Sequence, residues 1–312
     1  MASNQPSVFI DGEAGTTGLG IRQRLETTPG IVLRSLPAAQ RKDRSARQDM
    51  MAACDLVVLC LPDDAAREAV GLAVALGGAA PKLLDASTAH RVDPEWTYGF
   101  PEMTPEQPGQ IAEAHKVSNP GCYPTGTIAL LRPLVEAGLV PPDYPITISA
   151  VSGYSGGGRS MIEAHDRDGG PAFELYALGL EHKHVPEIEL YSGLSRRPIF
   201  MPSVGHFRQG MLVSVPLYLD DLPGKPAGAD LREALRAFYE GSEHVKVMAG
   251  DGQDKLEPEA LNGSNGLEVY VWENKARRQA ALVARLDNLG KGASGAAVQN
   301  LRLMLDLGPG PN

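Results

Sequence analysis

The sequence has few cysteines and no close cysteine pair. Cys54, Cys60 and Cys122 are its only three, and no CxxC spacing occurs among them. An odd number of scattered cysteines argues against a disulfide framework, and the missing pairs argue against a structural zinc site. We therefore expect neither a disulfide scaffold nor a structural metal.

Long runs of one residue type are also missing. The sequence has no basic run and its formal net charge is −9, so nucleic acid is not an expected partner. No apolar stretch is long enough to span a bilayer, so we expect no membrane association. Residues 1–6 are polar and lack the apolar core of a signal peptide, so the expected location is cytoplasmic.

The overall composition is that of a globular protein with room for two hydrophobic cores. The chain has 312 residues, of which 43% are hydrophobic and 21% charged. Its 35 glycines and 25 prolines follow no period, so they indicate turns rather than a repeat. An acidic protein of this kind that binds phosphates must gather its cations locally.

The first part of the chain predicts an α/β fold. Short apolar strands alternate with helical segments such as residues 67–76, which is typical of a doubly wound, mostly parallel sheet. Residues 55–61 are apolar almost throughout, as in a strand that is buried on both faces. The predicted strands are residues 7–11, 31–36, 55–61 and 82–85.

Beyond about residue 120 the pattern changes to longer, alternating strands, within the usual boundary error of about 2–4 residues. Alternation is typical of a largely antiparallel sheet with one covered face. Residues 230–239 predict an amphipathic helix that Asp230 could cap, and residues 294–305 predict a final helix. The predicted strands are residues 146–151, 211–219, 267–272 and 281–286.

A glycine-rich turn between the first strand and a helix predicts a phosphate-binding site. Glycines without side chains let backbone amides approach a pyrophosphate, and the helix N-terminus favours negative charge. The spacing is GxxGxxG rather than GxGxxG, so a plain tight turn stays an alternative. The residues concerned are Gly12, Gly15, Thr16, Thr17 and Gly18.

The end of the second predicted strand indicates NADPH rather than NADH. NAD-specific sites usually carry an acidic residue here that binds the ribose hydroxyls. This sequence instead has a hydroxyl and several cations, which suit a 2′-phosphate, although a solvated basic loop is the alternative for any one cation. The residues are Arg34, Ser35, Arg41, Lys42 and Arg44.

Cys122 is the candidate nucleophile. It lies in NPGCYPTG, just before a predicted helix with Pro124 in its first turn. The positive potential of a helix N-terminus favours the thiolate, which is the nucleophilic form. A small buried residue is the alternative interpretation. Cys54 and Cys60 flank or occupy a buried strand and are interpreted as core packing.

His182 and His184 are the candidate bases. Alternate residues of an extended segment share one face, so both imidazoles could line a cleft, where Glu187 could orient one of them. The HxH pair could also bind a metal, but no convincing third ligand lies near in sequence. Four other histidines are interpreted as structural: His90, His115, His165 and His244.

A second glycine-rich segment predicts another anion site. Glycines, hydroxyls and one arginine can form an anion nest, and an enzyme that releases phosphate needs such a site. A flexible loop is the alternative. The segment comprises Ser152, Gly153, Tyr154, Ser155 and Arg159, with Arg91, His206 and Arg208 as further candidates.

Taken together, these motifs show that the chain resembles the N-acetyl-gamma-glutamyl-phosphate reductase family in its shorter form. The resemblance extends over essentially the whole length, with NPGCYPTG and HKHVPE as the most specific motifs. Other matching segments are DGEAGTTGLGI, SLPAAQRKD, DAST-H-R, SGYSGGGR and LDNLGKGASGAAVQN. Longer family members space the N-terminal glycines differently, which limits the transfer of loop residues from them.

The resemblance implies a Rossmann domain for NADP, residues 1–120 completed by residues 287–312. It also implies an α+β catalytic and oligomerisation domain, residues 121–286, of the aspartate-semialdehyde dehydrogenase type. Cys122 matches the nucleophile, and His184 matches the catalytic histidine, with His182, Glu187 and Tyr176 as accessory residues. Matching cofactor contacts are the Gly12 to Gly18 turn, Ser87, Asn119, Asn288, Gly290, Lys291 and Gly292.

The implied reaction is the NADPH-dependent reduction of an acyl phosphate to an aldehyde through a cysteine thioester, in arginine biosynthesis. The implied assembly is a homo-oligomer, a dimer or a tetramer. The alternatives are a sister reductase acting on an aminoadipyl, aspartyl or carrier-linked acyl phosphate, a cysteine hydrolase, and a non-enzymatic NADPH redox sensor. A hydrolase would not need the N-terminal phosphate site, and a sensor would not oxidise a semialdehyde.

Overall fold

The computed structural model describes residues 5–250 and 254–308, and the chain divides into two compact units. The first unit contains the described residues up to Pro120 together with those from Ala293 onward, and the second is Gly121–Gly292. The described chain has no helix that is both long and apolar enough to cross a membrane.

The first unit is built on a six-stranded parallel sheet with the strand order β2-β1-β3-β4-β6-β5. Its central strand β3 is buried along its whole length, as its apolar sequence predicts. The strands are β1 (Ser7–Asp11), β2 (Val32–Arg34), β3 (Leu56–Leu59), β4 (Lys82–Asp85), β5 (Thr97–Tyr98) and β6 (Lys116–Ser118).

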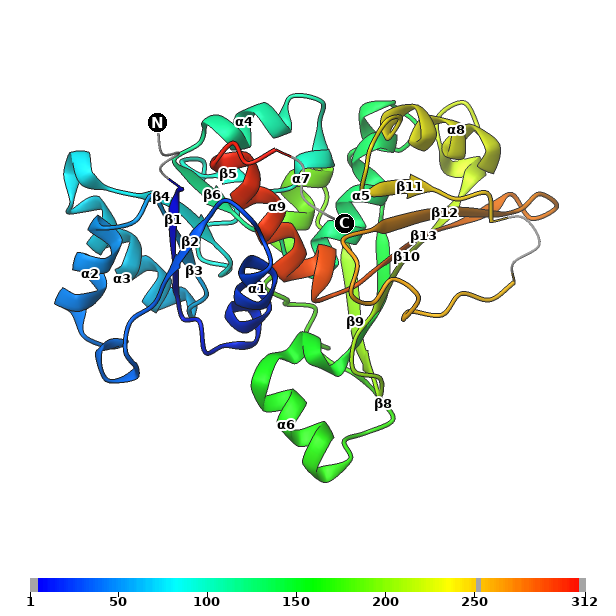
Figure 1. The fold of residues 1–312 in the computed structure, drawn as a ribbon. Coiled ribbons are helices and arrows are strands. Elements are labelled where there is room, and N and C mark those ends of the chain that lie inside the picture. The colour runs from blue at the N-terminus through cyan, green and yellow to red at the C-terminus, as the bar shows by residue number, and fades with distance from the viewer. Residues whose placement is uncertain (1–4, 251–253, 309–312) are drawn as a thin grey trace. The chain divides into compact units, whose positions relative to one another are not determined.

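Helices cover both faces of this sheet (Figure 1). Because side chains alternate along a strand, Val8 and Ile10 of β1 pack on one face and Phe9 on the other. The first face packs against α1 (Thr16–Glu26), α4 (Gln107–Glu113) and α9 (Gly295–Met304). The second packs against α2 (Arg44–Ala52) and α3 (Asp63–Val74). With helices on both faces the domain is doubly wound, and α9 from the end of the chain completes it.

The second unit is built on a seven-stranded mixed sheet with the strand order β11-β12-β13-β10-β7-β9-β8. Four of its six strand pairings are antiparallel, and β7–β9 and β11–β12 are parallel. The strands are β7 (Thr147–Gly153), β8 (Phe173–Leu175), β9 (Ile199–Gly205), β10 (Met211–Tyr218), β11 (Val245–Val247), β12 (Leu267–Asn274) and β13 (Gln279–Leu286).

One face of this mixed sheet is covered by α5 (Cys122–Glu136) and α8 (Gly228–Phe238). The helix α5 approaches β10 and β13 closely at Gly126, where a Cβ atom would lie 2.9 Å from Val213. Two further helices, α6 (Gly158–Asp168) and α7 (Val185–Ser192), complete the unit. The opposite face carries exposed apolar side chains, among them Met201 and Tyr218.

Three local expectations differ from the structure. Asp230 is not the N-cap of α8: the helix begins at Gly228, and Asp230 accepts a hydrogen bond from the Ala227 amide at 2.7 Å from inside the first turn. Residues 287–292 belong to the second unit, because Asn288 binds Gly210 and Ser155 there. A helix, α6, begins at Gly158 where the sequence indicated only a glycine loop.

A buried ion pair lies beneath the glycine-rich turn of the first unit. Arg47 of α2 donates from Nε and Nη2 to Oδ2 of Asp11 at 3.0 and 2.7 Å, and both side chains are over nine-tenths buried. Burial raises the pKa of Asp11, although Arg47 acts in the opposite direction. The carboxylate therefore depends on the Arg47 guanidinium to remain charged inside the protein.

We predict that Arg47→Met lowers the free energy of unfolding at pH 7 by about 3–5 kcal/mol, because it leaves a buried carboxylate without its counter-charge. The loss should shrink as the pH falls toward the raised pKa of Asp11, since the protonated acid needs no cation. Urea unfolding at two pH values measures both effects. The double variant Asp11→Asn, Arg47→Met is the control and should be more stable than Arg47→Met alone. A loss below about 1 kcal/mol, as for an exposed pair, would contradict the prediction.

Candidate functional site

The glycine-rich turn joins β1 to α1 in the first unit, and two of its glycines are required by packing. Gly12 has a φ of +91°, and a Cβ atom there would lie 2.3 Å from the carbonyl oxygen of Cys60. A Cβ atom on Gly18 would lie 2.6 Å from the carbonyl oxygen of Gly12. Both positions therefore exclude any other residue for reasons internal to the fold.

Gly15 differs from its two neighbours in the turn. It is the N-cap of α1 with an ordinary φ of −78°, and a Cβ atom there would meet nothing nearer than Gly12 at 3.5 Å. The fold therefore does not require glycine at position 15. A bare backbone at the start of a helix, with Thr16 and Thr17 opening the first turn, suits the close approach of a phosphate group.

A charged cluster lies between this turn and the end of β2. Glu13 accepts hydrogen bonds from Arg22 and Arg41 at 2.7 and 2.6 Å and from the Ser35 hydroxyl at 2.9 Å. The structure thus brings the predicted residues Ser35 and Arg41 together. Lys42, Arg34 and Arg44 are exposed and make no hydrogen bond or ion pair with this cluster in the described chain.

Sequence analysis missed Glu13 and Arg22 as members of this cluster. An acidic residue inside a phosphate-binding turn is unexpected, because its charge repels the ligand. The available signal was its position in DGEAGTTG, where a long side chain interrupts a run of small residues. Arg22 follows one turn after Gly18 on the same helix, which places it beside the turn.

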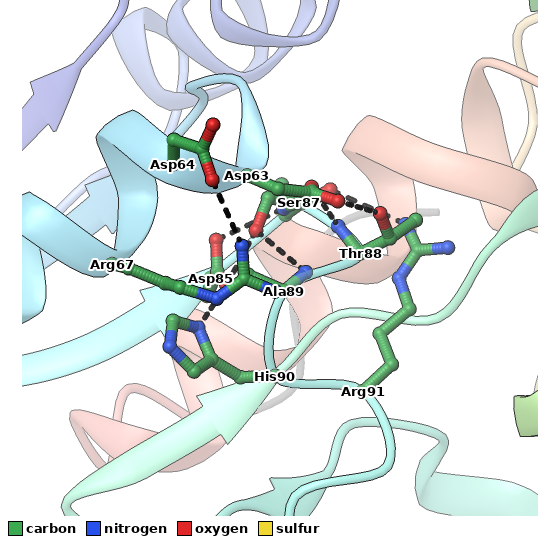
Figure 2. Close-up of polar contacts among 10 residues, drawn as sticks. Asp63, Asp64, Arg67, Asp85, Ser87, Thr88, Ala89, His90 and Arg91 are labelled. Carbon is green, nitrogen blue, oxygen red and sulfur yellow. Dashed lines mark hydrogen bonds and ion pairs between the residues drawn. The ribbon is translucent and has the colours of Figure 1, made fainter. Parts of the chain in front are cut away.

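The loop after β4 is held by a buried carboxylate (Figure 2). Asp85 is fully buried and accepts hydrogen bonds from the Ser87 hydroxyl at 2.7 Å and from Nδ1 of His90 at 2.6 Å. His90 also stacks on Trp96 at 4.4 Å, so its role is structural. Figure 2 shows Thr88 turned toward Asp63, to which its hydroxyl donates.

Two other predicted residues of the first unit are tied into the same region. Arg91 is buried and donates to the carbonyl oxygen of Ala86. Asn119 uses both ends of its side-chain amide: Nδ2 donates to the Ala293 carbonyl, and Oδ1 accepts from Asn300. Its backbone N–H is engaged as well, donating to the Asp85 carbonyl at 2.7 Å.

In the second unit, Cys122 is the first residue of α5 and is half-buried. The residue before it, Gly121, donates its backbone N–H to Oε2 of Glu187 at 3.1 Å. Glu187 is almost fully buried in the first turn of α7. Glu187 therefore fixes the helix start that carries the thiol, whereas the sequence suggested only that it could orient an imidazole.

The two candidate histidines meet around Tyr123, the neighbour of Cys122. The Tyr123 ring lies 6.0 Å from that of His182 and 5.9 Å from that of His184, and the two imidazoles lie 4.7 Å apart. The HKH segment is not extended as expected but turns into α7, which begins one residue after His184. In this turn the His184 amide donates to Nδ1 of His182 at 3.1 Å, which places the proton of neutral His182 on Nε2.

Tyr176 joins the same cluster through its hydroxyl. It donates to the hydroxyl of Tyr123 at 3.2 Å, and Tyr123 donates onward to the Ser203 carbonyl at 3.0 Å. Burial is the main reason why the pKa of Tyr176 rises to about 12 and that of Tyr123 rises further, and the nearby Cys122 acts in the same direction. Both phenols therefore stay neutral at physiological pH. Sequence analysis missed Tyr123, although it directly follows the nucleophile in NPGCYPTG.

The Gly290-Lys291-Gly292 segment passes directly beside Cys122. A Cβ atom on Gly292 would lie 2.7 Å from Cβ of Cys122, so only glycine fits here. Lys291 is fully buried. Asn288 binds the Gly210 amide through Oδ1 and the Ser155 hydroxyl through Nδ2, which occupies both ends of its side chain within the protein.

The second predicted anion site is only partly assembled. Ser152 and Ser155 are buried, and Ser155 accepts its hydrogen bond from Asn288. Gly153 is required by packing, because a Cβ atom would lie 2.5 Å from the Gln209 amide. Arg159 instead faces outward on α6 and pairs with Glu163 one turn away, at 2.7 Å.

Tyr154 belongs to a histidine cluster beside this loop. It stacks on His165 at 4.5 Å, and Nδ1 of His165 lies 3.0 Å from Nδ1 of His206. Its hydroxyl donates to Asp166, which also pairs with Arg208 at 3.2 Å. His206 and Arg208 therefore belong to the cluster around Tyr154, whereas Arg159 pairs with Glu163.

The remaining thiols are unsuited to nucleophilic chemistry. Burial raises the pKa of Cys54 and that of Cys60, which fits core packing. Among the described residues, no group of three or more histidine, cysteine, aspartate or glutamate side chains is placed to hold a metal ion.

Two family models match the chain. Residues 8–111 match the NAD binding domain of semialdehyde dehydrogenases, and residues 122–288 match the semialdehyde dehydrogenase dimerisation domain. Solved structures share the fold. Aspartate semialdehyde dehydrogenase II from Vibrio cholerae has a TM-score of 0.72 at 15% identity, covering 97% of this chain and 99% of that one. The Candida albicans enzyme, solved with NADP, has a TM-score of 0.69 at 16% identity, covering 96% and 98%.

Fold and domains thus define an oxidoreductase of the semialdehyde dehydrogenase class. Proteins with similar sequences show which enzyme family within this class the chain matches. N-acetyl-gamma-glutamyl-phosphate reductase 2 of Pseudomonas putida is 53% identical over 96% of this chain and 97% of its own length. The reductases of Burkholderia cenocepacia (51%; 96% and 97% covered) and Brucella suis (50%; 96% and 99% covered) are similar. The chain belongs to the N-acetyl-gamma-glutamyl-phosphate reductase family.

Proposed function

We propose that this chain reduces N-acetyl-gamma-glutamyl phosphate to N-acetylglutamate 5-semialdehyde with NADPH, releasing phosphate, as a step of arginine biosynthesis. The observation that carries the proposal is the placement of Cys122 at the start of α5, with its neighbour Tyr123 packed against His182 and His184. The relatives named for this reaction, which share about half of their residues with the chain, support the choice of substrate.

The first unit is the proposed NADP-binding domain, and the second is the proposed catalytic domain. The open backbone at Gly15 suits the pyrophosphate, and Ser35 and Arg41 suit the 2′-phosphate. Ser87, Asn119 and the Gly290 to Gly292 segment are further proposed contacts, as is Asn288 through its backbone. The bound cofactor supplies the hydride for the reduction.

Covalent capture by Cys122 starts the proposed mechanism. The thiolate attacks the acyl carbon, the carbon–oxygen bond to phosphate breaks, and phosphate leaves with that electron pair. Ser152, Gly153, Tyr154, Ser155, His206 and Arg91 are the proposed phosphate contacts. Arg159 would have to leave Glu163 to join them. The product of this step is a thioester on Sγ, which splits one difficult reduction into two easier steps.

His184 is the proposed proton donor. Once hydride has reached the thioester carbon, His184 protonates the developing oxyanion, and the amides at the start of α5 help to bind that charge. Return of the proton to His184 and cleavage of the carbon–sulfur bond release the semialdehyde and the Cys122 thiolate. His182 fixes the turn through the His184 amide, Glu187 fixes the helix start, and Tyr176 holds Tyr123.

The reverse reaction gives the sharpest test of this function. We expect NADP reduction with N-acetylglutamate semialdehyde to require phosphate and to vanish in Cys122→Ser, because no thioester can form, while NADPH binding survives. Phosphate-independent turnover, or substantial activity in Cys122→Ser, would refute covalent capture and acyl-phosphate formation.

Paired histidine variants extend the same assay. His184→Asn should lower kcat by about 10²–10⁴, the usual contribution of a general acid or base, and His182→Asn should cost less. If His184→Asn cost less than about tenfold, the proton transfer would be assigned to His182 instead.

Gly15→Ala tests the proposed pyrophosphate site. The methyl group meets no protein atom nearer than 3.5 Å at an ordinary φ, so the thermal midpoint should stay close to that of the wild type. NADPH affinity, measured by fluorescence titration, should fall at least about tenfold, because the methyl group occupies the space of the phosphates. Gly12→Ala, which clashes with Cys60, is the contrasting variant and should destabilise the fold itself. Unchanged NADPH binding in Gly15→Ala would place the pyrophosphate elsewhere.

We further propose that the chain is a cytoplasmic homo-oligomer in which a second copy covers the open face of the mixed sheet. Exposed apolar side chains line that face, including Ile199 and Met201 on β9 and Tyr218 on β10. The match of this unit to a dimerisation domain supports a copy of the same chain as the occupant. Sedimentation velocity should show a dimer or tetramer that Met201→Glu weakens, and a monomeric wild type would contradict this.

A further inference from the structure

Glu13 is an acidic residue inside a site whose proposed ligand is an anion, and this calls for a physical explanation. Its side chain is 9% exposed, and both of its carboxylate oxygens are engaged. Oε1 accepts from Nη2 of Arg41, and Oε2 accepts from Nη1 of Arg22 and from the Ser35 hydroxyl. The partners are more open, with 35% of the Arg22 side chain and 43% of the Arg41 side chain exposed.

We propose that Glu13 is a positioning residue of the 2′-phosphate site: it holds Arg22 and Arg41 side by side, with their remaining donors directed to the ligand. The inference rests on the proposed use of NADPH and adds Arg22 as a phosphate contact. Glu13 itself touches the arginines rather than the phosphate.

The hydrogen bonds of the two arginines support this role. Arg22 donates from Nε to Glu26 and from Nη1 to Glu13 and Ser35. Arg41 donates from Nε to the Leu36 carbonyl and from Nη2 to Glu13. Within the described chain, Nη2 of Arg22 and Nη1 of Arg41 make no hydrogen bond, so one terminal nitrogen of each guanidinium remains for a phosphate.

Preorganisation explains why an acidic residue is useful here. Two guanidinium groups that converge on one point repel each other, and long exposed side chains would otherwise sample many rotamers that a ligand must freeze on binding. A buried carboxylate between the two arginines removes their mutual repulsion and restricts the rotamers of their side chains. Counting formal charges, Glu13 and Glu26 (−1 each) with Arg22 and Arg41 (+1 each) sum to zero, so a phosphate would be bound through the remaining guanidinium donors rather than through a net positive charge.

Direct repulsion is the competing effect, and Glu13→Asp separates the two. Aspartate keeps the negative charge but is one methylene shorter, so it cannot reach both arginines from the fixed backbone beside Gly18. If Glu13 acted only through its charge, aspartate would behave like the wild type. If Glu13 acts by holding the arginines, aspartate will fail much as glutamine does.

The test is the affinity of the full-length protein for NADPH, NADH and 2′,5′-ADP, measured by calorimetry. In Glu13→Gln and in Glu13→Asp we expect NADPH and 2′,5′-ADP to bind about tenfold more weakly, equivalent to about 1.4 kcal/mol, with NADH affinity nearly unchanged. Glu26→Gln is the matched control: it removes the same charge from Arg22's other, exposed partner and should leave all three affinities unchanged.

The outcomes separate this inference from the function on which it rests. A wild type that does not prefer NADPH overturns both. If the wild type prefers NADPH, the inference alone is overturned by any of three results: tighter NADPH binding in Glu13→Gln, wild-type affinities in Glu13→Asp, or equal losses for NADPH and NADH. The last result would show a structural role, or contact of Glu13 with the ribose hydroxyls.

Discussion

One hydrogen bond positions the proposed reactive end of the second unit: the Gly121 amide donates to the buried carboxylate of Glu187. Gly121 is the N-cap of α5 and Glu187 lies in the first turn of α7, so the bond joins two helix N-termini. Both helix dipoles favour a negative charge at that point, which offsets part of the cost of burying it. A charge-assisted hydrogen bond of this kind contributes about 1.5–3 kcal/mol.

The consequence is that the starts of α5 and α7 are tied together. Cys122 follows the Gly121 N-cap of α5, and His184 is the N-cap of α7. The Gly292 backbone lies against the other side of Cys122, where a side chain at position 292 would collide with the Cys122 Cβ atom. The base of the Cys122 side chain is thus flanked by backbone on both sides, which suits a proposed nucleophile that must meet a carbonyl carbon in one geometry.

The sequence predicted the architecture well, because buried strands and glycine turns leave strong local signals. The β4 prediction matches the observed bounds, and β3 was recognised as doubly buried. Side-chain direction was harder to predict. The HKH segment was expected to be extended, but α7 begins at Val185 with Pro186 in its first turn, and the preceding turn brings the imidazoles together. Arg159 was expected in an anion nest, but a helix beginning at Gly158 places Glu163 within its reach.

The difficulty of predicting side-chain direction also explains why Glu13 and Arg22 were missed. Their positions bear on how the site selects its cofactor. A local pattern compares a residue with its neighbours in sequence, whereas Glu13, Arg22, Ser35 and Arg41 come from four different segments. In sites selective for NAD, an acid at the end of the second strand binds the ribose hydroxyls directly. Here an acid from the preceding turn reaches the same region, but two arginines bind its carboxylate. In the proposed site this reverses the effect of the acid on the ligand. The sign of a charge near a phosphate site therefore predicts little until its partners are known.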